Sequence, residues 1–211
     1  MPRRYLIGRL FGTDIFVTAD FFLLLAFYFV AGGADAGRMA LFCIALIVSL
    51  LVHEFGHVLA VRRLLHAPSA VILWGLGGLC VYPAVPRTPG KQVGISLMGP
   101  LHSALLGALC YALLRGLDPA PGAPREFLGI MVWINLFWGA ANLLPILPLD
   151  GGQALRAGLE FRMGPDRAAG AARRVSAVAA LLAAAAAVFY GRPIAAMICA
   201  FLMLQNLRGG A

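Results

Sequence analysis

The chain has 211 residues, of which 61% are hydrophobic and 12% are charged, and its formal net charge is +8. Soluble domains carry roughly 25% charged residues, so this composition excludes an ordinary soluble protein and predicts an integral membrane protein. The excess of basic residues is explained by contact with anionic lipid headgroups, without any role for nucleic acid.

The apolar stretches of the chain predict about six transmembrane helices. A helix that crosses a bilayer core about 30 Å thick needs about 20 apolar residues. The predicted spans are Asp20–Gly33, Met39–Val61, Val93–Leu114, Phe127–Leu147, Val175–Tyr190 and Pro193–Leu207. Most lysines and arginines fall on one side of these spans, and basic loops stay in the cytoplasm. We therefore expect a multi-pass protein of the cell membrane with both termini in the cytoplasm.

We expect a single membrane-embedded domain over residues 1–211, without a cleavable signal peptide. Its expected parts are a surface β segment at 1–19, four core spans at 20–147, a cytoplasmic loop at 148–174 and two further spans at 175–207. The four cysteines stand singly, with no CxxC pair, which indicates apolar packing residues rather than disulfides or a zinc knuckle.

Two short regions are typical of strands rather than helices. Residues 5–19, YLIGRLFGTDIFVTA, place two β-prone runs around a Gly-Thr-Asp turn and predict an N-terminal β-hairpin, with a longer first helix as the alternative. Residues 70–83, AVILWGLGGLCVYP, have basic flanks assigned to the same side, which predicts a hairpin that re-enters the membrane. Non-helical backbone at that depth requires an enclosed, partly wet interior. A phosphate-binding glycine loop is discarded because no Gly-Lys-Ser/Thr follows.

The second predicted span contains the sequence HEFGH at residues 53–57. On a helix, His53 and His57 lie on one face one turn apart, so both imidazoles can reach one metal ion. Glu54 is adjacent and can take a proton from a metal-bound water, as in other HExxH sites. The alternative is a pair of core histidines that hydrogen-bond across helices, but that alternative leaves the neighbouring buried glutamate unexplained.

A catalytic zinc site usually has three protein ligands, so a third ligand is needed. Most other acidic residues fall in surface turns or at helix ends, whereas Asp150 closes the segment NLLPILPLDGG at residues 142–152. Its prolines break the helix and its glycines allow a sharp turn, so the carboxylate can be aimed at a metal. Asn142 could hydrogen-bond a substrate carbonyl or a developing oxyanion, or serve as a helix-packing amide. Zinc suits these ligands best, although cobalt or manganese could bind them.

These motifs resemble those of the site-2 proteases, intramembrane zinc metalloproteases that cut the membrane-spanning helices of other proteins. The resemblance rests on HEFGH at 53–57, GGLCVYP at 77–83, MGPLHSALLG at 98–107 and NLLPILPLDGGQALR at 142–156. The opening IGRLFGTDIFVTADFFLLL at 7–25 is similar in outline. The chain is identified as a compact member without PDZ or CBS domains.

The resemblance implies an α-helical membrane protease with zinc as its cofactor. It implies that zinc is bound by His53, His57 and Asp150, that Glu54 activates water, that Asn142 holds the substrate backbone, and that the hairpin with Gly77 and Gly78 pairs with an unwound substrate. The implied substrate is a membrane protein with a transmembrane segment, such as an anti-sigma factor or a signal-peptide remnant. The other partner is the lipid bilayer.

One position departs from the family pattern. Members often carry asparagine where this chain has Ser103, which weakens the expectation of a polar substrate clamp there. Gly99, Ser103 and Gly107 instead form a stripe of small residues that predicts close helix packing. We expect His102, beside this stripe, to be packed or hydrogen-bonded rather than to face the cavity, and His66 to be solvated.

Two non-proteolytic functions remain as alternatives. A membrane metal transporter or metal sensor could use the same ligands without hydrolysis, but it has no use for Glu54 beyond charge balance. An inactive relative could bind transmembrane segments without cleaving them, although the complete ligand set argues against lost activity.

Overall fold

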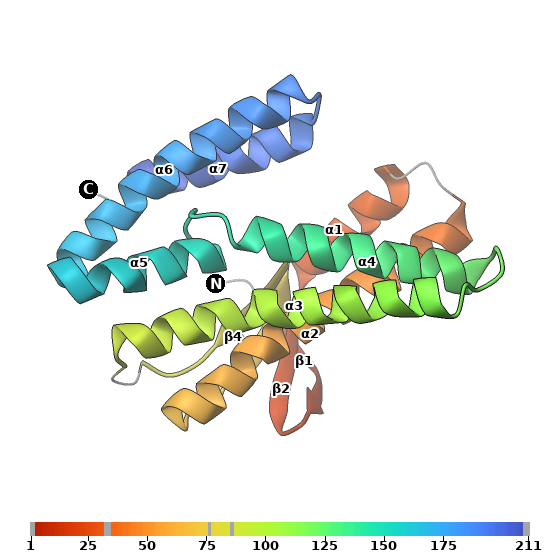
Figure 1. The fold of residues 1–211 in the computed structure, drawn as a ribbon, viewed down its shortest axis with the longest axis horizontal. Helices are drawn as coiled ribbons and strands as arrows, with labels where there is room; N and C mark the ends of the chain where they lie inside the picture. The colour runs from red at the N-terminus through yellow and green to blue at the C-terminus, as the bar shows by residue number, and fades with distance from the viewer. Residues whose placement is uncertain (1–2, 32–34, 76, 85–86, 209–211) are drawn as a thin grey trace. The chain divides into compact units, whose positions relative to one another are not determined.

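The computed structural model describes residues 3–31, 35–75, 77–84 and 87–208. Within these residues the chain is mostly helical and contains one small sheet (Figure 1). The elements in chain order are β1 (Arg4–Leu10), β2 (Thr13–Thr18), α1 (Ala19–Ala31), α2 (Ala36–Leu65), β3 (Ala70–Trp74), β4 (Gly77–Val81), α3 (Pro89–Gly116), α4 (Ala123–Asn142), α5 (Asp150–Met163), α6 (Pro165–Phe189) and α7 (Pro193–Arg208).

The chain forms two compact units. The first unit comprises Met1–Pro86 and Met98–Gly139, and the second comprises Arg87–Leu97 and Ala140–Ala211. Helices α3 and α4 each contribute residues to both units. The predicted ligands His53 and His57 therefore belong to the first unit and Asp150 to the second, and each unit is described in turn.

The sheet of the first unit joins two hairpins that are far apart in the sequence. Strands β1 and β2 pair antiparallel, as do β3 and β4, which confirms both hairpins as local structure. The parallel pairing of β2 with β3 was not predicted, and it makes one four-stranded sheet in the order β1-β2-β3-β4. Strands β1 and β4 are therefore its two edges.

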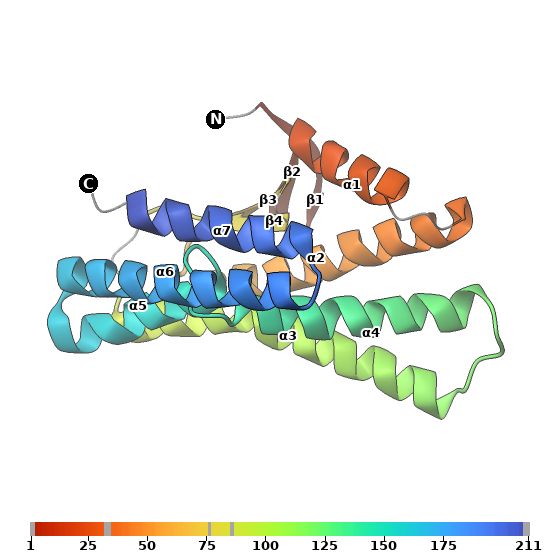
Figure 2. The ribbon, with the colours of Figure 1, turned by 90° about the horizontal axis from the view of Figure 1, so that it is seen from above.

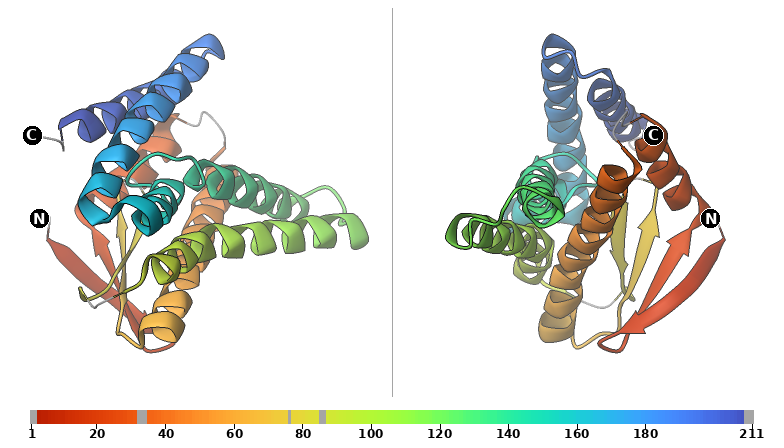
Figure 3. Two further views of the ribbon diagram at one scale, coloured as in Figure 1. Left: turned by 60° about the vertical axis from the view of Figure 1, so that its left-hand side comes forward. Right: turned by 90° about the vertical axis from the view of Figure 1, so that its right-hand side faces the viewer.

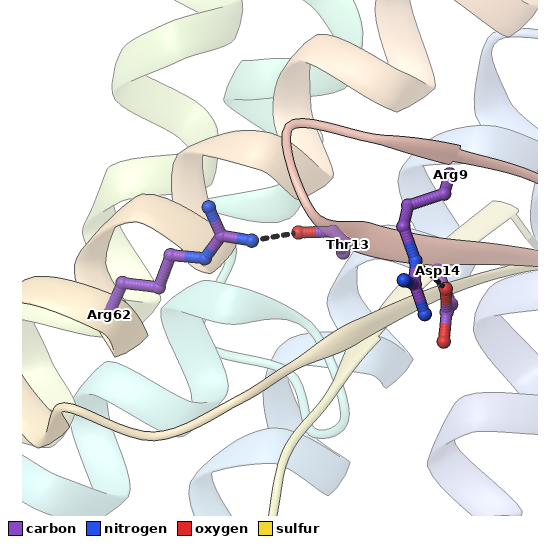
Figure 4. A network of polar contacts seen from close by, with 4 residues as sticks. All are labelled: Arg9, Thr13, Asp14 and Arg62. Atoms are coloured by element: carbon purple, nitrogen blue, oxygen red, sulfur yellow. Dashed lines mark hydrogen bonds and ion pairs between the residues drawn. The ribbon is translucent and has the colours of Figure 1, made fainter.

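The turn of the first hairpin is attached to α2. Gly12 adopts a φ of +74° there, a conformation that favours glycine, as the sequence predicts for a tight turn. The next residue, Thr13, is fully buried, and its hydroxyl accepts a hydrogen bond of 2.7 Å from Nη2 of Arg62 on α2 (Figure 4). One end of the sheet is thus held against the helix that carries the histidines.

Helix α2 forms the centre of the first unit. Its 30 residues begin after Asp35, whose carboxylate accepts a hydrogen bond of 3.0 Å from the Arg38 N–H, a favourable N-cap. The sheet lies along this helix (Figure 3). Apolar residues of α2, β3 and α4 form one core cluster, whose buried members include Leu50, Val58, Val71, Leu73, Met131 and Ile134. The HEFGH sequence therefore sits in well-packed surroundings.

Three helices in the described residues are long and apolar enough to cross a membrane: α2, α3 and α6. They make the chain a membrane protein. Helix α7 is apolar but has 16 residues, and α1 has 13. The count of six spans stays a prediction.

The second unit is largely an antiparallel pair of helices, α6 and α7, which run side by side (Figures 1 and 2). Alanines allow close packing here: Ala168, Ala172 and Ala180 of α6 are completely buried. The short connection between the helices uses Gly191, whose φ is +64°.

The segment predicted as a cytoplasmic loop between spans, residues 148–174, has regular local structure. Most of this segment is helical, in α5 and the first turns of α6, and Gly164 with a φ of +76° separates the two helices. Its charged residues mark a polar helix face, as the pair Arg156 and Glu160 at i and i+4 illustrates. Conversely, α4 ends at Asn142 rather than at Leu147, since Pro145 and Pro148 cannot continue a helix.

Candidate metal centre

His53, Glu54 and His57 are brought together in the buried core of the first unit. Their exposed fractions are 3%, 4% and 6%. The two imidazole rings are nearly perpendicular, at 76°, and their Nε2 atoms lie 3.3 Å apart. The helix thus directs both nitrogens toward one point, as the HExxH spacing predicts.

The separation of the two nitrogens fits a shared metal ion. Zinc binds imidazole nitrogen at about 2.0–2.1 Å with tetrahedral angles, so two such ligands are about 3.3–3.4 Å apart. The observed Nε2–Nε2 distance of 3.3 Å matches this value. Imidazole nitrogens suit zinc, and they also bind copper, iron and nickel.

Ser103 of α3 contacts the first histidine from behind. Its hydroxyl oxygen lies 3.0 Å from Nδ1 of His53, and the serine is 1% exposed. A metal-binding histidine usually donates its other ring N–H to such a partner, which fixes the tautomer and the ring orientation. The stripe of small residues predicts helix packing for Ser103, and this hydrogen bond was not predicted. Its place in the small-residue stripe, one turn after Gly99, was the available signal.

Gly99 makes room for both histidines. A Cβ atom at this position would collide with Nε2 of His57 and would lie 2.8 Å from Nε2 of His53. Real Cβ atoms essentially never come this close. Farther along α3, a Cβ at Gly107 would lie 3.2 Å from the Cβ of Asn135 on α4. The predicted close packing of the stripe is confirmed.

His102 is packed rather than directed at the histidine pair. Its Nδ1–H donates a hydrogen bond of 2.8 Å to the carbonyl of Met98, one turn back on α3. The same nitrogen would lie 2.9 Å from a Cβ at Gly56 of α2. The prediction that His102 is a packed, hydrogen-bonded residue is confirmed.

The hairpin of β3 and β4 lies directly beside Glu54. A Cβ atom at Gly78 would lie 2.5 Å from both Cγ and Oε1 of Glu54, so the backbone of β4 packs on this carboxylate. Gly77 has a φ of +133°, and a Cβ there would lie 3.1 Å from the indole of Trp138. The two glycines therefore allow an edge strand to approach the glutamate closely.

Asn142 and Asp150 belong to the second unit. Asn142 is the last residue of α4, and Asp150 is the first residue of α5. The seven residues between them form hydrogen-bonded turns, such as the 2.8 Å bond from the Leu149 N–H to the carbonyl of Ile146. A Cβ at Gly152 would lie 2.5 Å from the peptide nitrogen of Leu147. Asp150 is thus attached to a tightly folded segment.

Comparisons with known proteins agree with these features. A model of peptidase family M50 matches residues 120–183. The zinc metalloprotease Rip3 of Mycobacterium tuberculosis, so classed by its name, is 36% identical over 143 residues, which are 66% of this chain and 36% of that protein. The zinc metalloprotease MJ0392 of Methanocaldococcus jannaschii is 31% identical over 126 residues, which are 59% of this chain and 36% of that protein.

A solved structure supports the fold. The site-2 protease from Methanocaldococcus jannaschii matches with a TM-score of 0.70 and 20% identity, over 98% of this chain and 94% of that one. The chain spans about a third of the length of the curated relatives it matches. The family model and the curated relatives, taken together with the histidine pair and the adjacent glutamate, support peptidase family M50, the site-2 protease family, as the family of this chain.

Proposed function

We propose that this protein is an intramembrane zinc endopeptidase that hydrolyses peptide bonds in or near the transmembrane segments of other membrane proteins. The observation that carries the proposal is the buried pair of Nε2 atoms, 3.3 Å apart, with Glu54 beside them in the same helix. Burying two imidazoles and a carboxylate among apolar residues is costly, and metal chemistry gives all three a use. The relatives named as zinc metalloproteases support this function.

In this proposal His53, His57 and Asp150 would hold the zinc ion. Two imidazoles and one carboxylate form a common ligand set for catalytic zinc. When bound, zinc supplies a water of lowered pKa and polarises the carbonyl that is attacked. Glu54 takes the proton from this water and passes it to the leaving amine as the peptide bond breaks.

The proposed substrate lies along β4 as an added strand. A transmembrane helix hides its carbonyls in its own hydrogen bonds, so it must unwind locally before attack. An edge strand recognises an extended segment through main-chain hydrogen bonds, and the contact between Gly78 and Glu54 puts this edge next to the proposed general base. Gly77 and Gly78 would contact the substrate backbone, and Asn142 would hold a substrate carbonyl.

We place the protein in the cell membrane as a multi-pass protein of six spans, with both termini in the cytoplasm and β3–β4 re-entering the bilayer. Three helices in the described part of the chain can cross a membrane, and basic residues concentrate on the side assigned to the cytoplasm. The substrates would be single-span membrane proteins, with anti-sigma factors and signal-peptide remnants as candidates.

The test is the substitution Glu54→Gln, which removes the base and leaves the three ligands in place. We expect cleavage to fall by about 10²–10⁴-fold, the usual contribution of a general base, while metal content stays unchanged. Membranes from cells that express the wild-type chain or this variant would be compared by proteomics for truncated single-span proteins. Glu160→Gln, on the charged face of α5, is the matched control and should behave as wild type.

Two outcomes would contradict the proposal. Cleavage by Glu54→Gln at the wild-type rate would remove Glu54 as the base. A metal transporter or sensor would be favoured if the purified wild-type protein binds zinc but the membrane proteomes of cells with the wild-type chain and with Glu54→Gln are the same.

A further inference from the structure

The peptide backbone of Leu147 is held on both sides by side chains of the last two helices. Its N–H donates a hydrogen bond of 3.0 Å to Oγ of Ser176 on α6. Its carbonyl accepts a hydrogen bond of 2.8 Å from Nδ2 of Asn206 on α7. Leu147 lies three residues before Asp150. Leu147, Asp150, Ser176 and Asn206 all belong to the second unit.

Both side chains are buried in otherwise apolar surroundings. Ser176 is completely buried and Asn206 is 8% exposed. Next to them, Ile146 packs into a core cluster with Ala180 and Leu202. Burying polar groups in such a place is costly unless they are hydrogen-bonded. Ser176 and Asn206 therefore need hydrogen-bonding partners inside the apolar core.

The segment between α4 and α5 supplies these partners. Its prolines interrupt the helix, and backbone groups that leave a helix inside an apolar environment must be bonded elsewhere. The side-chain amide of Asn206 also donates a hydrogen bond of 2.8 Å to the carbonyl of Leu202, one turn back on its own helix. This second bond fixes the amide in the orientation in which it meets Leu147.

The path from Leu147 to Asp150 is short and stiff. Gly152 packs against the backbone of Leu147, and a Cβ atom added at Gly152 would lie 2.5 Å from the peptide nitrogen of Leu147. The Leu149 N–H bonds the Ile146 carbonyl at 2.8 Å, and the Gln153 N–H bonds the Leu149 carbonyl at 3.0 Å. A shift of Leu147 would therefore displace the first turn of α5, where Asp150 lies.

We propose that Ser176 and Asn206 are positioning residues that fix the carboxylate of Asp150 through the backbone of Leu147. The inference rests on the proposed function, in which Asp150 is a metal ligand. It makes the α6–α7 pair part of the support of the metal centre. Asp150 then keeps its place only while both helices remain docked on the segment before α5.

The test compares Asn206→Ala and Ser176→Ala with Gln205→Ala, a control on the exposed side of α7. The full-length protein would be purified into lipid nanodiscs and stripped of metal. Cobalt would then be titrated, with its visible absorption and its competition against a chelator as readouts. We expect cobalt binding to weaken about 10–100-fold in both variants, the usual effect of losing a support for a ligand, and the visible bands to change in intensity. Gln205→Ala should match wild type.

Two further measurements separate positioning from general destabilisation. Ser176→Thr keeps the hydroxyl and should restore most of the affinity that Ser176→Ala loses. In the metal-free protein, amide hydrogen exchange of residues 143–149 should be faster in Asn206→Ala than in Gln205→Ala, while exchange in residues 45–60 of α2 stays unchanged.

Asp150→Ala distinguishes failure of this inference from failure of the proposed ligand set. If Asp150→Ala binds cobalt as tightly as wild type, the ligand set is wrong and this inference falls with it. If Asp150→Ala binds weakly while Asn206→Ala and Ser176→Ala bind as wild type, the ligand set stands and the positioning role alone is overturned.

Discussion

The two units hold their proposed ligands in different ways. His53 and His57 lie within a continuous helix of 30 residues, where the helix repeat fixes the separation of their Cα atoms. Asp150 stands at the start of a helix, after a segment that prolines have broken. Its position depends on turns and on hydrogen bonds from side chains that lie far along the chain.

This difference predicts different sensitivities. The histidine pair should tolerate changes elsewhere in the protein but should be disrupted by added volume at its contacts with α3. The position of the aspartate should be more sensitive to substitutions elsewhere in its unit, because side chains from distant parts of the chain hydrogen-bond the backbone that supports it. The substitutions below test the histidine side, from the largest expected effect to the smallest.

The largest effect is expected from Gly99→Ala. The new Cβ would collide with Nε2 of His57, and both imidazoles would have to move away from their metal-binding geometry. We expect zinc affinity to fall by more than about 100-fold, beyond the usual loss of a supporting residue. Isothermal titration with zinc on the purified protein would measure it.

Gly116→Ala is the control for this substitution. Gly116 lies on the same helix, and a Cβ there would meet nothing within 4 Å. Both changes add one methyl group to the same helix, so the added methyl group by itself cannot explain a difference between them. Wild-type zinc affinity in Gly99→Ala would show that the contact with α3 does not constrain the histidines.

A smaller effect is expected from Ser103→Ala. The substitution removes the partner of Nδ1 of His53 but adds no volume, so the ring can rotate while the ligand remains. We expect zinc affinity to fall about 10–100-fold. The matched control is Ser96→Ala, a buried serine of the same helix that accepts a hydrogen bond from Gln92. An affinity loss of the same size in both variants would mean that Ser103 acts through packing alone.

The features that could be predicted from the sequence are those set by residues close together in the chain. The HExxH spacing predicted the facing histidines, and the turn residues predicted both hairpins, because helix and turn geometry are local properties. The helices within residues 148–174, predicted only as a connection between spans, were not foreseen from the polarity of that segment. A helix with one charged face has the same composition.

Features that depend on contacts across the chain could not be predicted in this way. The parallel pairing of β2 with β3 joins residues that are 56 positions apart, as Asp14 and Ala70 are. The hydrogen bond between Ser103 and His53 and the two hydrogen bonds made by the backbone of Leu147 likewise link separate helices or a helix and a distant segment. In each case the residue type was visible, but its partner was not.

The smallest effect is expected from Arg9→Gln, at the exposed edge of the sheet. The hydrogen bond from Arg9 to Asp14, 2.6 Å long, and the attraction between their charges lower the pKa of Asp14 (Figure 4). A carboxylate whose pKa is lowered by folding stabilises the fold above its unfolded pKa of about 3.9, and this contribution is lost as the pH falls through the folded value. Because the pair is exposed, water and salt screen it, and its contribution is small. We expect Arg9→Gln to leave zinc affinity unchanged and to lower the melting temperature slightly at pH 7 and low salt, with no difference from wild type below the folded pKa of Asp14. A large loss of zinc affinity would instead mean that the outer hairpin supports the histidines, so that the first unit, like the second, depends on contacts far from its ligands.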